Sequence, residues 1–266
     1  MNLTRTSKTL AFQMAAVFMA LNGASAEPSE ERGLEIAKEV DLRDTGFGDM
    51  KAEMEMALQN RHGDVSTRRM SMKTLEVQGD GDKSLIYFDQ PRDVKGTAFL
   101  SFTHKEGQDD QWLYLPALAR VKRIASNNKS GPFVGSEFAY EDLSSQEVEK
   151  YTYKYIEDRE IDGKNFLIVE RYPVDRSSGY TRQIMYVEEE RYIVTKIVFY
   201  DRKDSLLKTL DFVDFNQYLD KFWRPNEMVM ENHQTGKKTE LSWSEYVFSN
   251  GYTDRDFDQK TLRNIR

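Results

Sequence analysis

The chain has 266 residues, a net charge of −7 and no cysteine. The lack of cysteine excludes disulfides, thiol catalysis, thiolate metal sites and the lipid attachment of a bacterial lipoprotein. The acidic balance argues against nucleic acid as a partner. It also argues against standing adsorption to an anionic membrane, so that only transient membrane contact is expected.

The first 26 residues have the plan of a cleaved secretory signal. A basic leader precedes an apolar run at residues 10–21, which is too short to span a bilayer comfortably. Two alanines in the spacing of a cleavage site follow and end at Ala26. We expect residues 1–26 to be removed and residues 27–266 to form a single domain, because no linker or repeat divides them. A single membrane anchor is the alternative.

One helix is predicted at the start of this domain. Pro28 and Ser29 give a start signal, acidic residues occupy the first turn, and apolar residues recur at helical spacing up to Val40. The helix is expected to end before the turn "DTGFGD" at residues 44–49.

The remaining domain alternates with a period of two, which predicts β-strands. The turns "QNRHGD" and "IDGK" each join two such runs, which predicts two hairpins. The predicted strands are residues 51–58, 68–73, 84–88, 96–103, 111–115, 149–158, 165–172, 181–187, 191–200, 205–215, 222–232 and 238–248. The expected fold is mainly β (α+β), a single sheet of about ten antiparallel strands, with a turn and a short helix at the C-terminus.

Six methionines occur as three pairs at positions i and i+2, so that both members of a pair lie on one face of a strand. The pairs are Met54 and Met56, Met70 and Met72, and Met228 and Met230. Flexible thioethers suit a surface that adapts to varied apolar shapes. One interpretation is a pliable apolar pocket for acyl chains on the concave side of a curved sheet. The other is an ordinary core under a packed helix.

No catalytic or metal-binding motif is recognisable. The three histidines lie in or beside predicted turns, and none has a partner at metal-ligand spacing. The segment "GPFVGS" lacks the spacing and the lysine of a phosphate loop, and Ser136 lacks the flanking glycines of a nucleophile elbow. We therefore expect that the protein is not an enzyme and that it binds no metal and no other cofactor.

Two central segments resemble a known family. The segments "YFDQPRDVKGTAFLSF" at residues 87–102 and "DDQWLYLPALARVKRI" at residues 109–124, followed by "GPFVGSEFAYEDL", resemble the LolA-like outer-membrane lipoprotein-sorting proteins. The similarity is closest to the branch associated with membrane exporters of the RND/MMPL type. The resemblance implies a strongly curved, half-barrel antiparallel sheet, LolA/LolB-like, with helices covering its concave face. It also implies a periplasmic carrier without catalysis, which takes lipoprotein acyl chains or lipids from an inner-membrane exporter towards an outer-membrane acceptor.

The resemblance and the strand pattern together suggest two sets of site residues. The expected cavity wall consists of Met54, Met56, Met70, Met72, Phe99, Leu113, Leu115, Met228 and Met230. The expected cavity mouth, for a headgroup or a partner, consists of Arg120, Lys122, Arg123, Phe133, Phe138 and Tyr140. Its basic members suit phosphate headgroups, whereas the alternative is a solvated strand end.

Three functions therefore remain open from the sequence. The first is a periplasmic carrier of lipids or lipoproteins. The second is an envelope accessory protein that docks to a transporter and whose apolar face is an ordinary core. The third is a hydrolase, which the missing catalytic motif disfavours.

Overall fold

A computed structural model describes residues 29–264 of the chain. The predicted signal peptide and its cleavage point lie outside the described residues. Within residues 29–264, none of the helices has the length and apolar character needed to cross a membrane.

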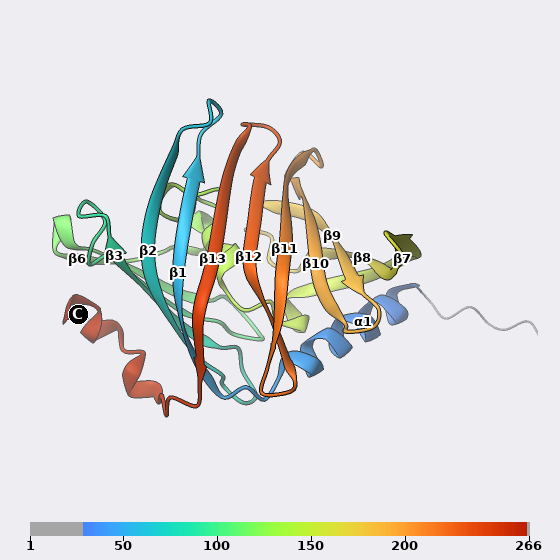
Figure 1. The fold of residues 1–266 in the computed structure, drawn as a ribbon, viewed down its shortest axis with the longest axis horizontal. Helices are drawn as coiled ribbons and strands as arrows, with labels where there is room; N and C mark the ends of the chain where they lie inside the picture. The colour runs from blue at the N-terminus through green and yellow to red at the C-terminus, as the bar shows by residue number, and fades with distance from the viewer. Residues whose placement is uncertain (1–28, 265–266) are drawn as a thin grey trace, which may run out of the picture.

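The described residues are built on one antiparallel sheet, in which hydrogen bonds join each strand to the strands beside it. Figure 1 shows the arrangement. The chain enters at the middle of the sheet and runs outward to one edge. The strands of this half are β1 Asp49–Gln59, β2 Val65–Leu75, β3 Lys83–Gln90, β4 Ala98–Phe102, β5 Asp110–Leu115 and β6 Arg120–Arg123.

The chain then crosses to the opposite edge and returns strand by strand to the middle. The strands of this half are β7 Tyr151–Ile161, β8 Lys164–Pro173, β9 Tyr180–Glu188, β10 Ile193–Asp201, β11 Leu206–Tyr218, β12 Phe222–Asn232 and β13 Lys237–Phe248. Pairing of β13 with β1 joins the two halves into one strongly curved sheet (Figure 1).

Every segment predicted as a strand overlaps an observed strand, but the count of about ten was wrong, because the sheet has 13 strands. The strand that the sequence did not reveal is β6, which has only four residues, three of them exposed. Such a short, charged edge strand has no buried face, and therefore no period-two signal for the sequence to show.

The helix α1 (Ser29–Asp44) confirms the predicted N-terminal helix, with Ile36 and Ala37 buried. It packs against β7 at one edge of the sheet. Gly33 permits this contact, because a Cβ atom at that position would lie 2.7 Å from the backbone nitrogen of Tyr155. The guanidinium of Arg32 lies 4.4 Å from the centre of the Tyr155 ring and extends the same contact.

A crossing segment, residues 124–150, connects β6 to β7. It contains four short 3-10 helices: η2 Ser126–Asn128, η3 Phe133–Gly135, η4 Tyr140–Leu143 and η5 Val148–Lys150. A further one, η1 Pro116–Leu118, lies between β5 and β6. Phe133 and Phe138 of this segment belong to the same buried cluster as the inward-facing residues of the strands. The expectation that helices cover the concave face was therefore wrong. The cover is mostly this irregular segment, in which Gly131, Pro132 and Gly135 leave no uninterrupted helical run.

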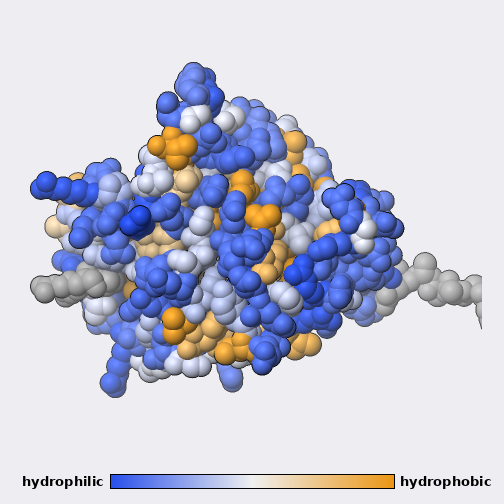
Figure 2. Space-filling model, viewed as in Figure 1, coloured by the Kyte–Doolittle hydropathy of each residue, from blue (hydrophilic) through white to orange (hydrophobic). Residues whose placement is uncertain are grey.

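The opposite, convex face carries a smaller cluster. Phe257 and Leu262, on either side of the start of the C-terminal 3-10 helix η7 (Gln259–Asn264), are 2 % and 1 % exposed and pack against Leu85 and Leu100. On the face seen in Figure 2, the surface is mostly hydrophilic, with apolar side chains scattered over it. The large apolar cluster therefore lies on the inside of the curve.

Candidate functional site

A cavity of about 1030 Å³ lies between the concave face of the sheet, the crossing segment and α1. Its volume is at the upper end of the range of roughly 300–1000 Å³ that is typical of ligand pockets. Its walls are predominantly apolar and combine methionine with aromatic and aliphatic side chains from strands throughout the sheet.

Four of the predicted wall residues line this cavity: Met54, Met56, Met72 and Met228. The strand register explains how residues far apart in the sequence meet. Met56 of β1 and Met228 of β12 are both paired with Leu241 of β13, and Met228 is also paired with Phe212 of β11. Directly paired residues point to the same face, so these side chains form one apolar row across four strands.

The other five predicted wall residues lie elsewhere. Met70 and Met230 are 1 % and 0 % exposed and belong to the packed core behind the cavity. Phe99 is also fully buried, with its ring centre 5.2 Å from that of Phe133. Leu113 and Leu115 line a second, smaller cavity of about 400 Å³ beside the crossing segment. Contact of any of the nine residues with a ligand stays a prediction.

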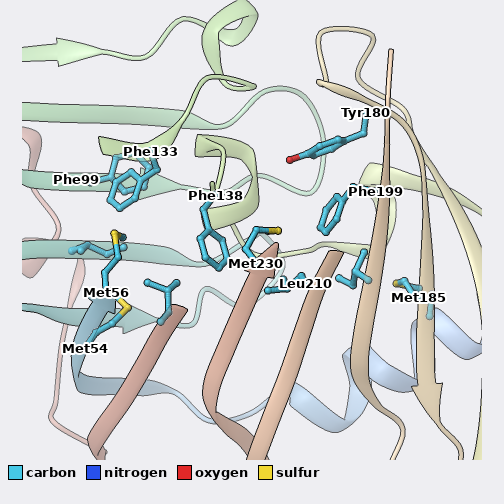
Figure 3. Packing of buried hydrophobic residues seen from close by; sticks show 14 of the residues in the cluster. Met54, Met56, Phe99, Phe133, Phe138, Tyr180, Met185, Phe199, Leu210 and Met230 are labelled. Carbon is cyan, nitrogen blue, oxygen red and sulfur yellow. The ribbon is translucent and has the colours of Figure 1, made fainter. Parts of the chain in front are cut away.

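The crossing segment explains why only part of the methionine surface is open. Phe133 projects from this segment towards Phe99, and Phe138 projects towards Met230 and fills the space over it (Figure 3). Both phenylalanines also line the large cavity. They are inner wall residues rather than parts of an exposed flap, since they are 0 % and 2 % exposed.

The residues predicted for the cavity mouth are not brought together. Arg120 and Arg123 are exposed on β6, the edge strand, and Arg123 is paired with Asp110. Lys122 and Tyr140 line the smaller cavity, whereas neither Arg120 nor Arg123 lines either cavity. The basic residues therefore lie at the rim of the sheet, and their role towards a headgroup or partner stays a prediction.

One part of the large cavity has charged walls, which the sequence did not indicate. Asp41 of α1, Asp82 before β3 and Glu147 of the crossing segment line it together with Lys105. Burial and, to a smaller extent, the negative charge of Glu147 raise the pKa of Asp82 to about 7. Burial likewise raises the pKa of Glu147, although the ammonium of Lys105, 3.9 Å away, opposes this.

These charged residues come from four separate parts of the chain, and no motif links them in the sequence. Arg171 on β8 also lines the cavity, and for this residue a signal does exist. In the run "NFLIVERYP" it shares a strand face with Leu167 and Val169, both of which are buried. A cation on an otherwise apolar strand face could have been noticed from alternation alone.

The hydroxyl of Thr74, which also lines the cavity, is buried without a hydrogen-bond partner among the described residues. Within residues 29–264, no group of three or more His, Cys, Asp or Glu side chains is placed to hold a metal ion. The large cavity thus combines a pliable wall of methionine and aromatic side chains with polar and charged groups, a composition that suits an apolar ligand with a polar end.

The chain is similar to several proteins of known structure. A domain from Vibrio parahaemolyticus, described as an outer membrane lipoprotein-sorting protein, is 56 % identical over 88 % of this chain and 99 % of its own, with a TM-score of 0.86. This chain belongs to the LolA-like family. The resemblance of the two central segments to the LolA-like family is thereby confirmed, whereas the association with RND/MMPL exporters stays a prediction.

Further comparisons agree with the LolA-like assignment. A DUF1329 family protein from Desulfovibrio piger is 30 % identical over 89 % of this chain and 100 % of its own, with a TM-score of 0.83. A LolA superfamily protein from Nitrosomonas europaea shares the fold, with a TM-score of 0.69 at 19 % identity over 88 % of this chain and 99 % of its own. A family model described as an uncharacterized protein matches residues 80–264. Comparison with curated proteins found no match.

Proposed function

We propose that this LolA-like protein is a periplasmic carrier that binds the acyl chains of lipoproteins or lipids in its large cavity. It would take them from an inner-membrane exporter, of the RND/MMPL type that the sequence resembles, towards an acceptor at the outer membrane. The observation that supports this most is the cavity of about 1030 Å³, walled by methionine and aromatic side chains on the concave face. The description of the Vibrio parahaemolyticus relative as a lipoprotein-sorting protein agrees with it.

The cavity wall suits a chain of variable length better than a single rigid ligand. Thioether side chains change rotamer at low cost, so Met54, Met56, Met72 and Met228 can follow different chain shapes. Each methylene group removed from water contributes about 0.8 kcal/mol. A long chain would therefore be held tightly and would leave slowly unless a partner competes for it.

A carrier of this kind needs opening and closing rather than bond chemistry. The crossing segment and α1 are the parts that separate the cavity from its surroundings, and neither is a strand of the sheet. Release at an acceptor would require one of them to move. No bond is made or broken in the proposed cycle, so no catalytic group is invoked.

The test is binding of a fluorescent acyl probe to the purified domain. Aspartate at Met54, Met72 and Met228 places charges in the apolar wall, and we expect probe affinity to fall by more than about tenfold, since burying an unpaired charge is costly. The control is Val65→Asp on β2, where the side chain is 58 % exposed. Its affinity should match that of the wild-type protein.

Unchanged binding in the triple variant would show that the probe does not occupy the cavity. A wild-type protein that binds no probe and carries no lipid would instead favour the accessory protein, with the apolar residues acting as an ordinary core.

A further inference from the structure

Arg171 is a buried cation in the wall of the large cavity. Arg171 is 4 % exposed. It lies on β8, on the same face as Leu167 and Val169, which are 3 % and 0 % exposed. Arginine is almost never buried to this extent without a partner of opposite charge.

The hydrogen bonds and the ring contact of its guanidinium group are with neutral groups. Nε donates a hydrogen bond to Oε1 of Gln183 at 2.7 Å, and Nη2 donates one to Oε1 of Gln146 at 2.9 Å. The group lies 4.1 Å from the centre of the Tyr151 ring. Among residues 29–264, no carboxylate lies within 4.0 Å of it, and Nη1 has no hydrogen-bond partner.

Two carboxylates of the same cavity wall have cations of their own. Asp142 accepts a hydrogen bond from the Lys208 ammonium at 2.7 Å, and Glu147 lies 3.9 Å from the Lys105 ammonium. The charge of Arg171 is therefore left without a counterion, whereas Asp142 and Glu147 of the same wall each have a cation within 4.0 Å.

Gln146 and Gln183 also fix how the guanidinium is presented. They occupy Nε and one Nη, so that the hydrogen-bonding capacity left over is concentrated on Nη1. A planar guanidinium held in this way is suited to an oxygen anion such as a carboxylate or a phosphate.

We propose that Arg171 binds the anionic oxygen group of a lipid whose acyl chain lies in the large cavity. The fitting ligand is a single-chain amphiphile with a carboxylate or a phosphate head, because methionine and aromatic side chains of the same wall can hold its chain. This inference rests on the proposed carrier function and adds a preference for an anionic head.

The test compares ligands that share one chain and differ only in the head. Hexadecanoate, hexadecyl phosphate and hexadecanol each compete with a fluorescent acyl probe at neutral pH. Acetate and inorganic phosphate serve as chain-free anions. We expect at least one of the two long-chain anions to bind about tenfold or more tightly than the alcohol, since charge-assisted hydrogen bonds are the stronger ones. The chain-free anions should not compete.

The variant Arg171→Met should lose the preference for the anion while its affinity for hexadecanol stays unchanged. The control Arg159→Met, at a side chain that is 44 % exposed on β7, should keep the preference. If Arg171→Met does not fold, Arg171→Gln replaces it with the same expected outcomes.

The proposal is overturned if the wild-type protein binds the anions and the alcohol equally, or if Arg171→Met keeps the preference. Both outcomes leave the carrier function intact, because the chain still binds. Absence of binding by every long-chain ligand would overturn the carrier function and this inference together. Competition by inorganic phosphate alone would identify a site for a free anion and would contradict the proposal that the ligand is a lipid.

Discussion

Asp82 has a carboxyl group in the wall of the large cavity, at the start of β3. Burial disfavours its charged form and raises its pKa to about 7, and the negative charges of Glu147, Glu76 and Asp44 act in the same direction. An ordinary aspartate is charged throughout the neutral range. In the folded protein this residue is therefore about half-protonated near neutral pH. A change of pH around this value changes its charge and, with it, the polarity of the cavity wall.

The raised pKa of Asp82 predicts how stability depends on pH. Between the ordinary pKa of 3.8 and about 7, the folded protein keeps a proton that the unfolded chain releases. Its contribution to the free energy of unfolding is therefore fully present below pH 3.8 and is lost as the pH rises to about 7.

Asp82→Asn should remove this loss and raise the free energy of unfolding at pH 8 by about 1–2 kcal/mol, with a smaller effect at pH 5. Urea unfolding at both pH values measures it. Glu106→Gln, at an exposed position of the β4–β5 turn, is the control and should have little effect at either pH. If Asp82→Asn raises the free energy of unfolding no more at pH 8 than at pH 5, the carboxyl group of Asp82 titrates like an ordinary aspartate.

Single residues also set the limit of what the sequence can predict about the site. The i, i+2 spacing of the methionines places them on one strand face, and all six lie in or against the large cluster on the inside of the curve. Whether a methionine lines the cavity or is covered depends on Phe133 and Phe138, which lie far from it in the sequence. The alternation of a strand contains no information on that contact.

Among the elements, the crossing segment is attached to the sheet by a buried ion pair. The ammonium of Lys208 on β11 lies 2.7 Å from Asp142, and both side chains are 5 % exposed. Lys208 also donates a hydrogen bond to the carbonyl of Glu137 at 2.9 Å, and the Tyr180 hydroxyl donates one to Asp142 at 2.8 Å. These polar contacts fix the segment over the apolar face.

Lys208→Met should leave the Asp142 carboxylate buried without a counterion. We expect the free energy of unfolding to fall by about 3–5 kcal/mol. The amides of residues 137–143 should also exchange faster with deuterium, because the segment loses its attachment. The control Lys196→Met breaks the exposed pair with Asp211 on the neighbouring strands and should cost less than about 1 kcal/mol.

Adding Asp142→Asn to Lys208→Met should cost less than the sum of the two single changes, since the two residues form one network. Equal losses for Lys208→Met and Lys196→Met would mean that the buried pair does not hold the crossing segment.

Regular elements were predictable and the irregular ones were not. Helix α1 and every strand with a buried face were indicated by their periods. The edge strand β6 and the 3-10 helices of the crossing segment show neither the helical period of 3.6 nor the strand period of two, because tertiary contacts determine their conformation. The residues predicted for a cavity mouth fell in these two regions, which explains why the structure separates them.

At the scale of the whole molecule, the joining of the two halves of the sheet creates the curved wall of the cavity. The pairing of β1 with β13 joins the beginning and the end of the domain, so that the strands on both sides curve around one apolar space. The family resemblance predicted a curved sheet with a concave apolar face. The local sequence contains no signal for the pairing of β1 with β13, nor for the way the crossing segment fills part of the concave space.

Native mass spectrometry of the protein purified from the periplasm tests the carrier function most directly. We predict that the spectrum contains, besides the protein alone, a species heavier by the mass of one acyl-chain lipid or one lipoprotein acyl group. In the variant with aspartate at Met54, Met72 and Met228 this species should be strongly reduced, and in Val65→Asp it should persist. A wild-type spectrum with the protein alone, together with no binding of an added acyl probe, would contradict the carrier function.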